Sequence, residues 1–122
     1  MQLLYIAAPY RAKTTAGISN NINEARLMSQ YYWLQGFAVI CPHLNSAHFD
    51  GLIPDPQFLK GTKLMLATCS HIALHPRWSF SSGCMEEYHY ATSNNITPHF
   101  TVMSRVRKKL SLTMGEPQLN FV

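Results

Sequence analysis

Four short apolar runs, separated by stretches with helical spacing, constrain the fold of this chain more than any other feature of its sequence. The first run, Leu3 to Ala8, is almost continuously apolar and ends at Pro9, which is typical of a strand buried on both faces. Similar runs occupy residues 37–41, 72–74 and 96–103. Strands that alternate with helices form a parallel sheet with right-handed crossovers. We therefore predict an α/β fold: a single Rossmann-like domain with a parallel sheet of four to five strands and helices on both faces.

Helices and loops fill the segments between these strands. The first expected helix has regularly spaced apolar residues and is followed by Gly36, a common residue just past a helix end. We expect the domain to span residues 1–103, followed by a C-terminal element with a basic tail over residues 104–122. The predicted helices cover residues 21–35, 58–68 and 83–94, and the longer loops cover residues 11–20 and 43–56.

Composition limits the class of protein. The chain has 122 residues, of which 47% are apolar and 13% charged, so it is long enough for one globular core and too rich in apolar residues to be disordered. No apolar run approaches the roughly 20 residues of a membrane span, and we expect the N-terminal run to be a strand rather than a signal peptide. The three cysteines, Cys41, Cys69 and Cys84, lack paired spacing. We expect reduced, mostly buried thiols in a cytoplasmic protein, and no zinc site.

Basic residues gather near the C-terminus. The net charge is +4, and four of the ten basic residues are Arg105, Arg107, Lys108 and Lys109. Electrostatic binding of nucleic acid needs a patch that makes several phosphate contacts. We therefore interpret this run as the solvated end of a helix, and do not expect nucleic acid as a partner.

The loops that follow the strands are expected to form a binding site, because ligands of open parallel sheets lie beyond the carboxyl ends of the strands. This rule places four segments around one cleft, which are residues 9–20, residues 42–55, residues 75–82 and the turn after Met103.

The loop before the helix at residues 83–94 carries the strongest signal. Ser81, Ser82 and Gly83 precede a helix whose first N–H groups lack internal partners, so the segment can bind an anion. Glu87 follows Gly83 by four residues and shares its helix face. A carboxylate held there could reach the anomeric carbon of a bound sugar. The alternative is structural: Ser81 or Ser82 caps the helix, and the glutamates favour its dipole.

Two residues near the first strand could serve the same site. Tyr5 lies on the strand, and its hydroxyl could reach the cleft, although strand tyrosines are commonly core residues. Arg11 follows in the next loop and could pair with a phosphate or a carboxylate; the alternative is an ordinary solvated arginine.

Four further residues have less specific patterns. His43 and His48 flank a loop that contains Asp50, but without regular ligand spacing, so we predict no metal site. Trp78 either stacks on a base or belongs to the rim of the core.

Taken together, these residues resemble the nucleoside 2-deoxyribosyltransferase superfamily, which includes the 2'-deoxynucleoside 5'-phosphate N-hydrolases and many small phage proteins. The resemblance covers roughly residues 3 to 102. It rests on Tyr5-Ile6-Ala7-Ala8-Pro9-Tyr10-Arg11, Asn21-Ile22 with Ala25, Gly36, Pro42-His43, and Ser81-x-Gly83-x-x-x-Glu87-x-x-x-Ala91, in that order.

The resemblance implies roles for individual residues. Glu87 corresponds to the nucleophile that takes the sugar, and Tyr5 to the tyrosine that orients it. Ser81 matches the nucleotide hydrolases, whereas the transferases tend to carry an aspartate there; a serine at a helix N-terminus accepts a 5'-phosphate that an aspartate would repel. Arg11 matches an arginine of the hydrolases. The resemblance also implies a nucleotide or nucleoside ligand, no cofactor, and a homodimer or larger assembly.

The sequence departs from the pattern where acids are expected. Thr62 and Ser70 stand in place of aspartates before and at the start of the third strand. N-glycosidic cleavage needs a proton for the departing base, and loss of a positioned acid costs about 10²–10⁴-fold in rate. Asp50, Asp55 or His43 could supply the proton, and we assign the role to Asp50. The predicted function is cleavage of the N-glycosidic bond of a nucleoside 5'-monophosphate, with Glu87 as the nucleophile. The alternative is a catalytically silent sensor or sponge for a nucleotide-derived signal, as in phage counter-defence.

Overall fold

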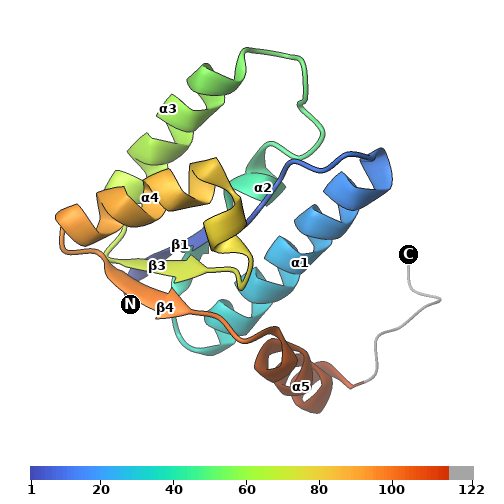
Figure 1. The fold of residues 1–122 in the computed structure, drawn as a ribbon. Coiled ribbons are helices and arrows are strands. Elements are labelled where there is room, and N and C mark those ends of the chain that lie inside the picture. Colours follow the sequence, from blue (N-terminus) through green and yellow to red (C-terminus); the bar gives the residue numbers. More distant parts are fainter. Residues whose placement is uncertain (116–122) are drawn as a thin grey trace.

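A four-stranded, all-parallel sheet forms the centre of the computed structural model, which describes residues 1–115 (Figure 1). The strand order is β2-β1-β3-β4, and Tyr5 on the second strand in space lies opposite Ile40 and Ile72. The predicted α/β class and single Rossmann-like domain are therefore confirmed. The strands are β1 (Leu3–Ala7), β2 (Ala38–Ile40), β3 (His71–Leu74) and β4 (Thr97–Phe100).

Helices cover both faces of the sheet (Figure 1). Alternate residues of β1 divide the core: Leu4 and Ile6 pack with Ala25 and Met28 of α1, whereas Tyr5 packs on the side of α3 and α4. This alternation follows from the two-residue period of a strand. The helices are α1 (Thr15–Leu34), α2 (Pro42–Asn45), α3 (Asp55–Ala67), α4 (Ser82–Ser93) and α5 (Met103–Met114), with a 3₁₀ turn η1 (Trp78–Phe80) before α4.

Two helices begin earlier than the sequence predicted. The loop expected over residues 11–20 is wrong, because α1 starts at Thr15, where the Thr14 hydroxyl accepts a hydrogen bond from Gly17 N–H (3.0 Å). Likewise α3 starts at Asp55 instead of residue 58. A proline and an acid in the first turn both favour a helix start. The loop expected over residues 43–56 is also shorter than predicted, because α2 occupies its first residues.

The C-terminal element belongs to the same core. The fourth strand ends at Phe100 instead of residue 103, and α5 packs against α1 with Val106 and Leu110 buried. Arg107 in the basic run is paired with Glu24 of α1 (2.7 Å). The remainder of the expected basic tail, residues 116–122, lies outside the described residues.

Cys41, Cys69 and Cys84 are all buried and unpaired, as expected. Within residues 1–115, no helix has both the length and the apolar character that crossing a membrane requires.

Candidate active site

A cavity of about 410 Å³ opens beyond the carboxyl end of β1. From β1 the chain continues to β2 on one side of it, and later returns to β3 on its other side. The strand order therefore changes direction at β1. Ligands of such sheets bind at this switch point, and the volume is within the usual range of about 300–1,000 Å³ for ligand pockets. Three of the four predicted segments contribute to the lining, together with α3 and α4. The fourth, expected as a turn after Met103, is wrong: Met103 begins α5, and this segment does not line the cavity.

Glu87 and Tyr5 meet at the inner end of this cavity. Helix α4 carries Glu87 one turn beyond Gly83, and β1 directs the fully buried Tyr5 toward the same face. The Tyr5 hydroxyl donates a hydrogen bond to Glu87 Oε2. Burial raises the pKa of Glu87 to about 7, although the hydrogen bond from Tyr5 opposes the shift. Burial, followed by the charge of Glu87, raises the pKa of Tyr5. At neutral pH Glu87 is therefore near its titration midpoint.

Thr62 faces this pair from α3, where the resemblance implies an acid. Its hydroxyl lowers the pKa of both Tyr5 and Glu87 and donates a hydrogen bond to Leu59 O (3.1 Å). Ser70 is exposed ahead of β3, at the opposite end of the strand from the cavity. Of the two substituted positions, only Thr62 could thus affect the chemistry.

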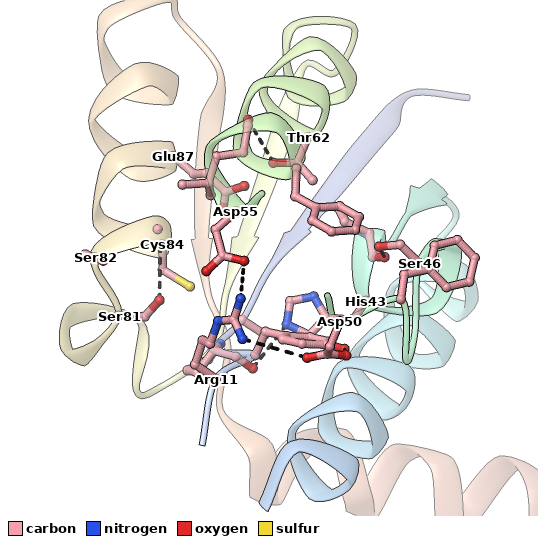
Figure 2. A pocket seen from close by; sticks show the side chains of 18 of the residues that line it. Arg11, His43, Ser46, Asp50, Asp55, Thr62, Ser81, Ser82, Cys84 and Glu87 are labelled. Carbon is pink, nitrogen blue, oxygen red and sulfur yellow. Dashed lines mark hydrogen bonds and ion pairs between the residues drawn. The ribbon is translucent and has the colours of Figure 1, made fainter. Parts of the chain in front are cut away.

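Arg11 is held in the cavity by two carboxylates (Figure 2). It makes an ion pair with Asp55 and a longer one with Asp50 (3.8 Å). Asp50 also accepts a hydrogen bond from the Tyr10 hydroxyl (2.6 Å), and this bond is the main cause of its lowered pKa. Asp50 therefore has the environment of an ionised carboxylate, contrary to the expected role of proton donor. Arg11 lines the cavity as predicted, but paired with acids.

His43 lines the cavity as a neutral imidazole. Its Nε2 lies 3.1 Å from Pro9 O. Since a carbonyl only accepts, Nε2 must carry the proton of this hydrogen bond. Burial lowers the pKa of His43. The ring also makes an edge contact with Tyr10 at 5.3 Å between centroids. His43 thus holds the loop after β1 in place.

Ser81 caps α4, which is the structural alternative considered above. Its hydroxyl accepts a hydrogen bond from Cys84 N–H (3.3 Å). Ser81, Ser82 and Gly83 also line the cavity. The backbone N–H groups of the first helical residues have no acceptor within the helix. Capping and anion binding are compatible, because the backbone N–H groups of Ser82 and Gly83 are not used by the cap.

Trp78 does not line the cavity. It packs against Tyr88 and Phe100, with ring centroids 4.6 and 6.2 Å away, so it belongs to the rim of the core and not to the site. Phe80, two residues later, is 88% exposed and does line the cavity. Sequence reasoning missed Phe80, as well as Phe49 and Phe58 on the opposite wall, because nothing in their spacing distinguishes them from core aromatics.

A buried polar network outside the cavity fixes the loop after β1, and it too was missed. The Asn21 amide donates to the carbonyl groups of Tyr10 (3.1 Å) and Arg11 (3.3 Å) and accepts from Arg77 (3.1 Å). Glu24, one turn later on α1, accepts from the buried His75 (2.6 Å) and also pairs with Arg77. The network thus joins α1, the loop after β3 and the backbone that carries Arg11.

Comparison of the chain with protein-family models, with curated proteins and with solved structures finds no match. The part of the chain that the structure describes has no group of three or more His, Cys, Asp or Glu side chains placed to hold a metal ion. The class of protein is therefore defined by fold and site: an α/β domain with a paired Tyr and Glu in a cavity at its switch point.

Proposed function

We propose that the protein cleaves the N-glycosidic bond of a nucleoside 5'-monophosphate, with Glu87 as the nucleophile. The observation that carries this proposal is the contact of the buried Tyr5 with the partly buried Glu87 in a ligand-sized cavity. A carboxylate in a desolvated site is a stronger nucleophile than one in water, and a tyrosine hydroxyl fixes its orientation. The pKa of about 7 keeps a substantial fraction of Glu87 ionised at neutral pH.

The lining residues divide into a phosphate end and a sugar end. Ser81, Ser82 and Gly83 at the start of α4, assisted by Arg11, bind the 5'-phosphate through N–H groups and charge. Glu87, one turn further along the helix, attacks C1' and forms a glycosyl ester while the C1'–N bond breaks and the base departs with its electrons. Water or a second base then attacks C1' and displaces Glu87, which gives hydrolysis or transfer.

A second candidate function is binding without cleavage. Thr62 replaces an expected acid, and Asp50 is held as an ionised carboxylate by Tyr10 and Arg11. A protein that binds a nucleotide here and cannot protonate its base would act as a sensor or sponge.

We also propose, from the resemblance, a homodimer or larger assembly. Exposed apolar side chains beside the cavity support it: Phe49, Leu52 and Leu64 are 47%, 70% and 70% exposed. Sedimentation of the protein, with Leu64→Glu as the test and exposed Leu112→Glu on α5 as the control, would show whether this surface is the contact.

Release of free base from a panel of ribo- and deoxyribonucleoside monophosphates, followed by chromatography, tests the main proposal. We expect Glu87→Gln to lose at least about 10³-fold in rate, and Tyr5→Phe to move the pH midpoint upward because the hydrogen bond that lowers the pKa of Glu87 is lost. Glu86→Gln is the matched control, since Glu86 is the exposed neighbour on α4. Base release by the Glu87→Gln variant at the original rate would contradict the assignment of Glu87 as the nucleophile. Tight binding without release from any nucleotide would favour the second candidate.

A further inference from the structure

Cleavage of an N-glycosidic bond leaves an electron pair on the departing nitrogen. A neutral purine or pyrimidine therefore departs as an anion unless a positioned acid protonates it, and such an acid contributes about 10²–10⁴-fold in rate. The donors that line the cavity decide which kind of base this site can release. The inference that follows rests on the proposed function.

Outside the start of α4, the hydroxyl and imidazole protons of the cavity are already used within the protein. Tyr5 donates to Glu87, and Tyr10 donates to Asp50. His43 donates its Nε2 proton to a backbone carbonyl. The two remaining hydrogen-bonded hydroxyls donate to helix carbonyls, Thr62 to Leu59 O (3.1 Å) and Ser46 to Pro42 O (3.1 Å).

The carboxyl groups are no better placed to donate. Asp50 and Asp55 both pair with the guanidinium of Arg11, and the hydrogen bond from Tyr10 lowers the pKa of Asp50. The serines at the start of α4 lie at the phosphate end, and their hydroxyls are weakly acidic. Apart from Glu87, which the proposed function uses as the nucleophile, we find among the described residues that line the cavity no side chain that is both acidic and free to protonate a leaving base.

The same residues favour a cation. One positive group, Arg11, stands against three carboxyl groups, namely Asp50, Asp55 and Glu87; Figure 2 shows them in the one cavity. Aromatic side chains complete the lining: Tyr10, Phe49, Phe58 and Phe80. Aromatic faces together with carboxylates attract planar cations.

We propose that the substrate is a 5'-nucleotide whose base is already cationic, such as a pyridinium or an N7-alkylated purine. The C1'–N bond breaks with both electrons passing to nitrogen, so the base departs neutral and no acid is needed. Glu87 Oε forms a bond to C1' in the same step. Water then attacks C1', the electrons of the ester bond return to Glu87, and one proton is released to solvent. The phosphate remains at the start of α4, one helical turn from Glu87.

Two substrate comparisons test this inference. The first uses nicotinamide mononucleotide, which carries a pyridinium. The second is a matched pair, 7-methylguanosine 5'-monophosphate and guanosine 5'-monophosphate, each rate being divided by that of the uncatalysed reaction. We expect release of nicotinamide, and an acceleration for the methylated nucleotide that is at least about 10²-fold greater than for its neutral partner. Glu87→Gln must abolish both reactions.

Asp50→Asn and Asp55→Asn identify what the acids do. If they attract the cationic base, each variant lowers kcat/KM for nicotinamide mononucleotide relative to that for guanosine 5'-monophosphate by about tenfold. Any effect of a freed Arg11 on the phosphate cancels in this ratio. If either aspartate instead protonates the base, its variant loses the neutral nucleotide and keeps the cationic one, and our inference is overturned. Glu86→Gln serves as the control, and thermal melts establish that each variant is folded.

The outcomes separate the two proposals. Glu87-dependent release from neutral nucleotides, without preference for cationic ones, overturns this inference and leaves the proposed function standing. Binding without release from every cationic and neutral nucleotide overturns both.

Discussion

A carboxyl group whose pKa rises from 4.5 to about 7 in the folded protein makes stability depend on pH. Below pH 4.5 Glu87 is neutral in both states, so its burial carries no charge penalty. Between pH 4.5 and 7 the unfolded chain loses this proton before the folded protein does, and stability falls as pH rises. Above pH 7 the penalty is complete, at up to about 3 kcal/mol for a shift of this size.

Glu87→Gln removes this dependence. We expect the free energy of unfolding of the variant, relative to that of the original protein, to increase by up to about 3 kcal/mol between pH 4.5 and pH 8. Urea denaturation at several pH values measures it. Glu86→Gln should show a smaller change with pH, because Glu86 is exposed and its charge is only a secondary cause of the raised pKa of Glu87. Parallel stability curves for Glu87→Gln and the original protein would mean that Glu87 is not desolvated as described.

Single residues differed in how far they could be predicted. Local patterns placed Tyr5 on a strand and Glu87 on the cleft-facing side of a helix, and the family resemblance implied that they meet, as they do. The pairing of Arg11 with Asp50 and Asp55 depends on the path of residues 43–56, which no local periodicity determines. Trp78 was ambiguous because local spacing does not show whether its ring faces the cleft or, as observed, Tyr88 and Phe100.

The starts of two helices allow capping and phosphate binding to be separated. Thr14 and Ser81 both cap a helix through their hydroxyl groups, and only Ser81 lines the cavity. We expect Thr14→Ala and Ser81→Ala each to lower the free energy of unfolding by about 1 kcal/mol. Only Ser81→Ala should raise KM for a 5'-nucleotide.

Ser81→Asp refines this test, because aspartate caps a helix as well as serine does but repels a phosphate. We expect unchanged stability, a raised KM for the nucleotide, and little change in KM for the corresponding nucleoside. Equal effects on both ligands would indicate that the 5'-phosphate does not lie at the start of α4.

Among the features of the secondary-structure elements, the helix starts were predicted least accurately from the sequence. Gly17 and Asn20 indicate a loop by composition, with the helix beginning only at Asn21, yet α1 starts at Thr15. Asn21 tolerates the helix because its amide bonds the carbonyl groups of Tyr10 and Arg11 instead of competing with its own backbone. Tertiary partners of this kind are not visible in a local pattern.

At the scale of the whole molecule, the alternation of strands and helices was sufficient to predict the parallel sheet, and the rule for ligands at strand ends was sufficient to predict the face of the site. The spatial order β2-β1-β3-β4 was not predicted. It places β4 at an edge of the sheet. For this reason the segment that follows β4 and begins α5 lies away from the cavity that the other three segments share.

The C-terminal helix provides the last prediction, because the expected domain ended at residue 103. Leu110 on α5 is 5% exposed, whereas Leu112 on the same helix is 77% exposed. If α5 is part of the core, Leu110→Ala leaves a cavity and lowers the free energy of unfolding by about 2–4 kcal/mol. Leu112→Ala loses the same atoms from a solvated position and should change it by less than about 0.5 kcal/mol. Chemical denaturation of both variants decides between an integral and a peripheral α5. Equal, small effects of the two substitutions would support a domain that ends at residue 103. The expected difference would mean that the ion pair between Arg107 and Glu24 lies within one cooperative unit.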